Sequence, residues 1–183
     1  KVGSAPFHSW LCDVYDGALT SVTLLFASAP KIVIFGVIFK LFLVVFNDFS
    51  HIWAPVFMFA SVSSIIIGSL SAIFQKRLKR LLAYSTISHT GFILLGIACA
   101  SVNSASSLIF YIVIYAFLTI LTFSLLIFFI LTQVNFPAYI ANWTSLGLRN
   151  YVFVISFVFV LIAIAGIPPL SGFFSKFLIL LSV

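Results

Sequence analysis

Two lysines lie deep inside apolar stretches, where an ammonium group is costly and therefore suggests chemistry. Lys31 stands about eleven residues into an apolar stretch over residues 20–45, or about 16 Å along a helix. Lys176 follows Gly172 and precedes an apolar tail. A lysine at the centre of a bilayer costs roughly 2.5–3.5 kcal/mol on insertion scales. Because an ammonium group without water releases its proton more readily, we expect both lysines to take part in proton transfer.

Each lysine has a structural alternative. Lys31 could pair with a carboxylate, but the three aspartates of the chain all lie outside the middle of the apolar stretches. Lys176 could lie near the membrane surface if its span stopped near residue 166. The apolar residues 177–183 argue against that placement. The two lysines are therefore the leading candidates for function.

One histidine and one further lysine are weaker candidates. His89 lies about 12 Å into a span that begins near Leu81, with Ser85 one turn before it. The ordinary pKa of histidine, near ~6.5, suits a proton relay, and a hydrogen-bonded packing role is equally open. Lys1 precedes a break at Pro6, and its position alone gives it little weight. The remaining polar residues of these segments are expected near the membrane surface, holding turns or reaching water: His8, Asp13, Asp16 and Lys40.

Motifs that bind cofactors are absent from the sequence. Cys12 and Cys99 are far apart and form no CxxC pair, which excludes an iron–sulfur cluster built from this chain alone and disfavours zinc. The sequence contains no HExxH, GxGxxG or phosphate-binding loop. We therefore expect this chain to hold no cofactor and no metal.

The composition decides the class of protein. Of the 183 residues, 63% are hydrophobic and 7% are charged, against about 45–50% and about 25% in soluble domains. Soluble globular, disordered and coiled-coil proteins are thereby excluded. Much of the net charge of +6 comes from a basic run at residues 76–80. We interpret this run as a topology anchor on the positive side of a membrane, with lipid or partner contact as the alternative, and not as a nucleic-acid site.

The uncharged stretches predict an all-α membrane protein with about six transmembrane segments, two of them broken helices, in a single transmembrane domain over residues 1–183. The expected elements, in chain order, are a short interrupted helix over 1–18, spans over 20–45, 51–74, 81–100 and 108–131, a connection over 132–150, and two half-helices within 151–183. These half-helices flank Gly166-Ile-Pro-Pro-Leu-Ser-Gly172, a strong helix breaker.

The basic run predicts the orientation in the membrane. If it is internal, one crossing per span places residues 47–50 and the serine-rich loop 101–107 outside. The same count places residues 132–150 inside, with Arg149 on the positive side.

Motifs along the whole chain resemble the antiporter-like subunits of respiratory complex I, most closely the subunit 2 branch. They are Lys1-Val-Gly-Ser-Ala-Pro6-Phe-His8-Ser-Trp10, Pro30-Lys31-Ile32, Lys79-Arg80-Leu-Leu-Ala-Tyr84-Ser85-Thr86-Ile-Ser-His89-Thr-Gly91, Tyr111 with Tyr115, and Ala165-Gly166-Ile-Pro168-Pro169-Leu-Ser-Gly172-Phe-Phe-Ser-Lys176. Each motif is weak alone, and together they are highly specific. Cys12 and Leu19 depart from the family pattern at the first break.

The resemblance implies a larger fold of inverted repeats, with charged residues along the membrane mid-plane. It assigns Lys1 and Lys176 to the lysines of the two broken helices, Lys31 to the central lysine of the next helix, and His89 to the connecting route. The family pairs the first lysine with a glutamate on an earlier helix. Because this chain has no Glu, we expect a separate chain, carrying the N-terminal half, to supply it. The last helices of the subunit are also expected outside this chain.

We therefore expect a proton-translocating membrane-arm subunit of an NADH:ubiquinone oxidoreductase, without redox chemistry of its own. Protons would move along Lys1, Lys31, His89 and Lys176, because two unit charges ~10 Å apart at a dielectric of ~20 interact by ~1.7 kcal/mol. NADH, FMN, iron–sulfur clusters and ubiquinone would belong to other subunits. The expected partners are the other membrane-arm subunits and phospholipids.

The Phe-rich composition without Glu favours the mitochondrial inner membrane over a bacterial membrane. Two alternatives in function stay open, an Mrp-type cation/proton antiporter subunit and a non-pumping structural subunit. A small-molecule transporter comes third, because the sequence shows no sign of a substrate cavity.

Overall fold

The computed structural model describes residues 1–99, 101–132, 139–143 and 151–182, and these are almost entirely helical. The α-helices are α1 (Ser9–Gly17), α2 (Thr20–Phe39), α3 (Ser50–Ile73), α4 (Leu78–Ala98), α5 (Val102–Thr132), α6 (Tyr151–Ala165) and α7 (Ser171–Ser182). A π-helical turn, η1 (Lys40–Val45), extends α2, and short 3-10 turns are η2 (Asn47–Phe49) and η3 (Ile140–Trp143). Within those ranges no strand forms. The predicted all-α class is confirmed.

Four helical stretches are long and apolar enough to cross a membrane. They are Thr20–Val45, Asn47–Ile73, Leu78–Ala98 and Ser104–Thr132, with 26, 27, 21 and 29 residues. At 1.5 Å per residue, even the shortest is about 32 Å long, enough for a hydrocarbon core of about 30 Å. The four predicted spans therefore form, with shifts of a few residues at their ends.

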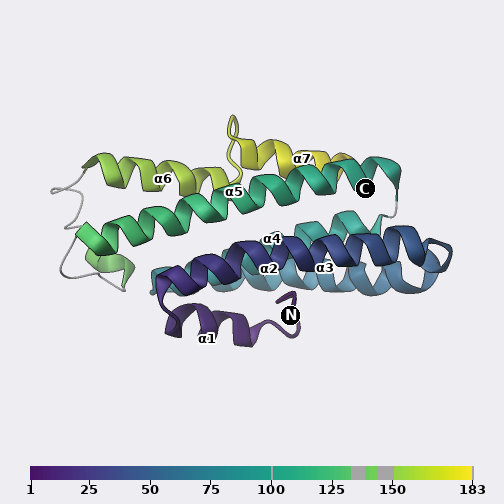
Figure 1. Cartoon of the computed structure of the whole chain (residues 1–183), viewed down its shortest axis with the longest axis horizontal. Helices are drawn as coiled ribbons and strands as arrows, with labels where there is room; N and C mark the ends of the chain where they lie inside the picture. The colour runs from purple at the N-terminus through teal and green to yellow at the C-terminus, as the bar shows by residue number, and fades with distance from the viewer. Residues whose placement is uncertain (100, 133–138, 144–150, 183) are drawn as a thin grey trace.

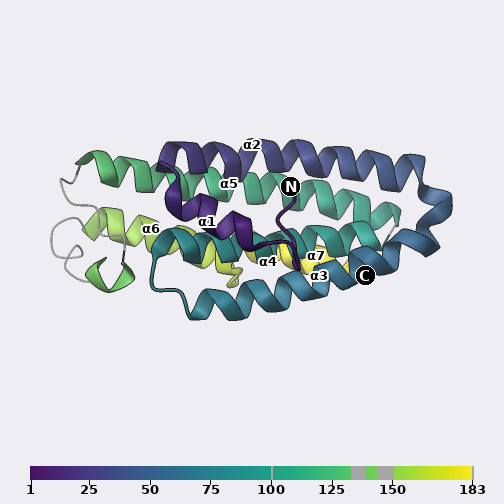
Figure 2. The ribbon, with the colours of Figure 1, turned by 90° about the horizontal axis from the view of Figure 1, so that it is seen from below.

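α4 lies at the centre of the bundle. Figure 1 shows α1 below a layer of α2, α3 and α4, with α5, α6 and α7 above. Figure 2, seen from below, shows α2 and α3 on opposite sides of α4. Of the α4 span, 72% is buried, compared with 17% of the span that contains α3. A polar side chain on α4 therefore needs partners within the protein, because lipid and water are both excluded.

Two glycines allow the backbones of α3 and α4 to approach closely. A Cβ at Gly68 on α3 would stand 2.7 Å from the backbone nitrogen of Ser88, and one at Gly91 on α4 would stand 2.9 Å from the carbonyl oxygen of Ser61. Small residues at such crossings are the usual means of packing helices in membranes, where van der Waals contact replaces the hydrophobic effect. This pair fixes the position of the central helix.

The predicted loop over residues 101–107 is wrong, because α5 already begins at Val102. The backbone N–H of Ser101 donates to Ser104 Oγ at 3.0 Å, and the Ser104 N–H donates to Ser101 Oγ at 3.0 Å. These reciprocal bonds satisfy free donors at the helix start, as in a capping box. The serines that suggested a loop are therefore part of a helix N-terminus.

The predicted break in the last span is confirmed. α6 and α7 lie end to end along α5 in Figure 1, and neither is long enough to cross a membrane alone. Gly166 has a φ of +85°, a conformation that side chains with a Cβ rarely adopt. A Cβ at Gly172 would overlap the carbonyl oxygen of Ala163, so the two half-helices meet in close contact.

The basic run and the connection before α6 lie at the same end of the bundle. The backbone N–H of Ile140 donates to the Lys76 carbonyl oxygen at 3.0 Å, and an isolated β-bridge joins Arg77 to Tyr139. This agrees with the predicted order of crossings. Arg149, which was predicted on the same side, lies outside the described residues.

Candidate functional site

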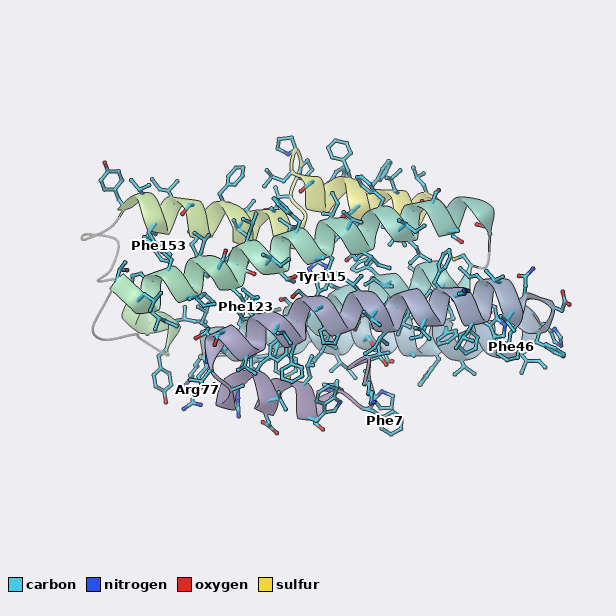
Figure 3. The ribbon with its side chains drawn as sticks, viewed as in Figure 1. Phe7, Phe46, Arg77, Tyr115, Phe123 and Phe153 are labelled. Carbon is cyan, nitrogen blue, oxygen red and sulfur yellow. The ribbon has the colours of Figure 1, made fainter. Side chains whose placement is uncertain are left out.

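Lys31 is a buried ammonium in the middle of α2. Its side chain is 4% exposed, and its Nζ donates to the Tyr115 hydroxyl on α5 at 3.2 Å. The Nζ also lies 5.4 Å from the centroid of the Tyr115 ring. Figure 3 labels Tyr115 in the space between α5 and α2. The partner of this predicted lysine is thus a phenol, which stabilises the charge less than a carboxylate would.

His89 contacts the same part of α5 as Lys31 does. It is buried on α4, and its Nδ1 lies 2.6 Å from the hydroxyl oxygen of Tyr111. Its ring lies 5.3 Å from the Tyr115 ring, centroid to centroid. Tyr111 and Tyr115 are one helical turn apart and so lie on one face of α5. The two tyrosines therefore connect the histidine of α4 with the lysine of α2.

A small cavity lies beside His89 and Tyr115. It has a volume of about 10 Å³, and hydroxyl side chains of α4 and α5 line it, among them Ser85, Thr86, Thr119 and Thr122. Apolar side chains form most of its surface, among them Leu82, Leu118 and Phe123. The Thr86 and Thr119 hydroxyls donate to carbonyl oxygens of their own helices, so their oxygens can accept a further bond.

Lys176 reaches back from α7 across the break. Its Nζ donates to the carbonyl oxygens of Ile164 at 3.2 Å and Ala165 at 2.9 Å, at the end of α6. The last carbonyls of a helix have no partner within the helix and carry partial negative charge. The same Nζ lies 5.5 Å from the centroid of the Phe92 ring on α4. The ammonium therefore caps α6 and faces the helix that carries His89.

Lys1 and Lys31 line one cleft of about 430 Å³ beside α1 and α2. Trp10 and Tyr15 of α1 form part of its wall. Lys1 itself is exposed, whereas Lys31 is buried. The structure thus links three of the four predicted residues, Lys1 with Lys31 at a cleft and Lys31 with His89 through tyrosines, and it places Lys176 beside α4.

The basic run holds the end of α1. Arg77 donates a hydrogen bond to Asp16, Arg80 donates to Asp13 at 3.3 Å, and Lys79 donates to the Ala18 carbonyl oxygen at 2.8 Å. The hydrogen bond with Asp16 raises the pKa of the Arg77 guanidinium above its ordinary value. The two aspartates, which were predicted to hold a turn, thus pair with the run that was predicted to anchor the topology.

In the part of the chain that the structure describes, no group of three His, Cys, Asp or Glu side chains is placed to hold a metal ion. Cys12 is buried on α1, and Cys99 follows α4 as a free thiol. The groups that meet at the centre of the bundle, Lys31, His89 and Tyr115, are proton donors and acceptors.

Sequence reasoning gave no role to Tyr111 and Tyr115, although both stood in the motif that carried the family resemblance. Their signal is their spacing of four residues on a helix that carries no charged residue. Such spacing places two phenols on one face. The sequence alone does not say which helix that face meets.

A sequence model of the family described as NADH:quinone oxidoreductase/Mrp antiporter, TM, matches residues 1–183. NADH-ubiquinone oxidoreductase chain 2 of Marchantia polymorpha is 40% identical over 177 residues, which are 97% of this chain and 35% of that protein. NADH-quinone oxidoreductase subunit N of Nitrosomonas europaea is 38% identical over 184 residues, which cover 100% of this chain and 38% of that protein. The chain thus spans little more than a third of the length of these relatives.

Two solved structures share the arrangement of helices. A chain of respiratory complex I from Thermus thermophilus with bound aureothin has a TM-score of 0.78 and 28% identity, over 99% of this chain and 39% of that one. A chain of the Mrp complex from Dietzia sp. has a TM-score of 0.83 and 22% identity, over 100% of this chain and 34% of that one. The second likeness shows the fold alone.

Proposed function

The chain belongs to the NADH:quinone oxidoreductase/Mrp antiporter transmembrane family, and we propose that it is part of a proton-translocating subunit in the membrane arm of respiratory complex I. The observation that carries the proposal is the contact between Lys31 and Tyr115, beside His89, in the middle of the bundle. A buried ammonium without a neighbouring carboxylate is costly, and membrane proteins keep such groups mainly for transport. The names of the relatives support the choice of complex.

In the proposed mechanism, charge moves between neighbouring groups. Gain or loss of a proton at Lys1 changes the field at Lys31 across their shared cleft. Because like charges in a medium of low dielectric repel strongly, Lys31 then releases its proton towards His89. Lys176, whose Nζ lies 5.5 Å from the centroid of the Phe92 ring on α4, receives the proton next. This sequence needs no electron transfer in the chain.

The enzyme activity is that of the whole complex. We propose that NADH oxidation and ubiquinone reduction, with FMN and iron–sulfur clusters, take place on other subunits. The proposed neighbours are other membrane-arm subunits and phospholipids. For location we propose the mitochondrial inner membrane; the relatives themselves include both mitochondrial-type chains and bacterial subunits.

The proposal is tested by Lys31→Ala in the assembled complex. In closed membrane vesicles, we expect fewer protons pumped per NADH oxidised. Lys40→Ala is the matched control, because Lys40 lies on the same span but is exposed. An unchanged proton yield in the Lys31→Ala complex would contradict the proposed function.

The second candidate is a subunit of an Mrp-type cation/proton antiporter, because the Dietzia sp. structure has the same fold. The two candidates predict different partner subunits for this chain. Purification of the complex under mild detergent, followed by assay of NADH oxidation with a quinone acceptor, separates them. Co-purifying NADH oxidation supports complex I, whereas sodium/proton exchange without it supports the antiporter.

A further inference from the structure

Ser64 on α3 is hydrogen-bonded to the part of the chain that precedes α1. The backbone N–H of Ala5 donates to its hydroxyl oxygen at 2.8 Å, and the hydroxyl in turn donates to the Ala60 carbonyl oxygen at 2.6 Å. Ser61 and Ser69, on the same helix, donate to carbonyl oxygens of α3 itself. Ser64 therefore also holds a residue that lies 59 positions away in the sequence.

This bond satisfies a backbone group that has no helix around it. Residues 1–8 form no helix, and Ala5 is 1% exposed. A backbone N–H that is buried away from water needs a partner within the protein. Figure 2 shows the chain reaching α3 before it turns into α1. The hydroxyl oxygen of Ser64 is the partner that the Ala5 N–H finds there.

The segment that is held in this way begins with Lys1. Its next residue, Val2, packs against the buried cluster that includes Phe35 of α2. Ala5 is bonded to α3 on the other side. Because Val2 and Ala5 are both held, the backbone brings Lys1 to the cleft that it shares with Lys31.

We propose that Ser64 is a positioning residue for Lys1, which holds the segment before α1 on α3 and thereby keeps Lys1 at the cleft beside Lys31. The repulsion between two like charges varies inversely with the distance between them. The place of Lys1 therefore decides how strongly a proton gained there acts on Lys31. Ser64 itself neither gains nor loses a proton in this role. The inference rests on the proposed function, because it assumes that Lys1 acts on Lys31.

The first test is hydrogen–deuterium exchange in the intact complex that carries Ser64→Ala. This change removes the acceptor for the Ala5 N–H, so we expect the backbone amides of residues 2–8 to exchange at least several-fold faster. Ser61→Ala is the matched control, because Ser61 is equally buried on α3 but donates to the Met58 carbonyl oxygen of its own helix. Exchange in Ser64→Ala at the rate of the control overturns the proposal.

The second test is the number of protons pumped per NADH oxidised by the assembled complex in closed vesicles. We expect this yield to fall in Ser64→Ala towards that of Lys1→Ala, and to stay unchanged in Ser61→Ala. A hydroxyl that only supports folding would lower the amount of assembled complex and leave the yield unchanged, and that result counts against the positioning role.

A pair of variants with the same shape applies if Ser64→Ala does not assemble. Ser64→Thr and Ser64→Val both add bulk at a site that is 0% exposed, but Thr alone keeps a hydroxyl that can accept the bond from Ala5. We expect Thr to retain at least several-fold more pumping than Val. Equal pumping in the two variants contradicts the positioning role.

A double variant shows whether Ser64 acts through Lys1. In a complex that already carries Lys1→Ala, the further change Ser64→Ala should lower the yield no more, because residues that act as one unit are not additive. A further fall would contradict the role assigned to Ser64. If Lys31→Ala lowers the yield and Ser64→Ala does not, this inference alone fails. If Lys31→Ala leaves the yield unchanged, the proposed function fails as well.

Discussion

The ammonium of Lys176 lies 2.9 Å from the carbonyl oxygen of Ala165, across the break that separates α7 from α6. The charge that we assign to proton transfer is thus also the charge that holds the two half-helices together. Loss of its proton would weaken its bonds to the end of α6, because a neutral amine is a weaker donor than an ammonium. Protonation and the geometry of the break are therefore linked.

Substitutions at Lys176 should separate these two roles. Lys176→Arg keeps a donor for the carbonyls but stays charged at all working pH values, so we expect normal assembly with impaired pumping. Lys176→Met removes both the charge and the hydrogen bonds to the carbonyl oxygens at the end of α6. This loss costs about 2 kcal/mol and should lower the thermal midpoint of the complex. The measurements are proton yield in vesicles and thermal denaturation in detergent. Normal pumping in Lys176→Arg would contradict the exchange role.

Removal of the Tyr111 hydroxyl should disturb His89. Tyr111→Phe leaves a buried imidazole nitrogen without its partner at 2.6 Å, which costs about 1–3 kcal/mol. We expect lower pumping together with an altered pH profile, because the ring is freed to change its tautomer. Pumping as a function of pH is the measurement, with Tyr151→Phe as control. A profile that matches the control would show that Tyr111 does not set the state of His89.

The glycine contact between α3 and α4 predicts a stability effect without a change in charge. Gly91→Ala places a methyl group 2.9 Å from the Ser61 carbonyl oxygen, and such overpacking costs typically about 1–3 kcal/mol. Gly36→Ala is the control, since a Cβ there meets nothing within 4 Å. Thermal denaturation of the purified complex should show a lower midpoint for Gly91→Ala alone. Equal midpoints would mean that the helices separate easily at this crossing.

The ion pairs at the end of α1 predict a dependence on salt. Asp16→Asn removes the charge that faces Arg77 and Arg80, and we expect α1 to become more accessible to proteases at low salt. The difference from the unmodified protein should shrink as salt rises, because exposed charges are screened. Asp48→Asn, at an exposed aspartate of η2, is the control. A difference that persists at high salt would indicate a packing role for Asp16.

The positions of the spans could be predicted from the sequence because charges and helix breakers interrupt the apolar runs. The break at Gly166 followed from its glycine and two prolines, and the burial of Lys31 followed from its depth in an apolar run. The start of α5 could not be predicted from the sequence, because Ser101 and Ser104 are typical of both a loop and a helix cap. Local composition therefore predicts which segments are helical better than it predicts the residues at which the helices begin and end.

The pairing of helices around the site could not be predicted. Spans that are apolar on all sides carry almost no periodic signal for the face that meets a neighbour. The contact of Tyr115 with Lys31 joins residues 84 positions apart, and nothing local favours that partner over another. The same holds for Asp16 and the basic run, which are close in space only because α1 folds back against α4.

The candidate membrane span in α5 has 29 residues, whereas that in α4 has 21. At 1.5 Å per residue the longer stretch measures about 44 Å, well beyond the roughly 30 Å of a typical hydrocarbon core. It must tilt, protrude or thicken the surrounding lipid, each at a modest energetic penalty per ångström of mismatch. The acyl-chain length of the surrounding lipids should therefore change the tilt of α5 relative to its neighbours. Bilayer thickness is thus expected to affect the helix that carries both tyrosines.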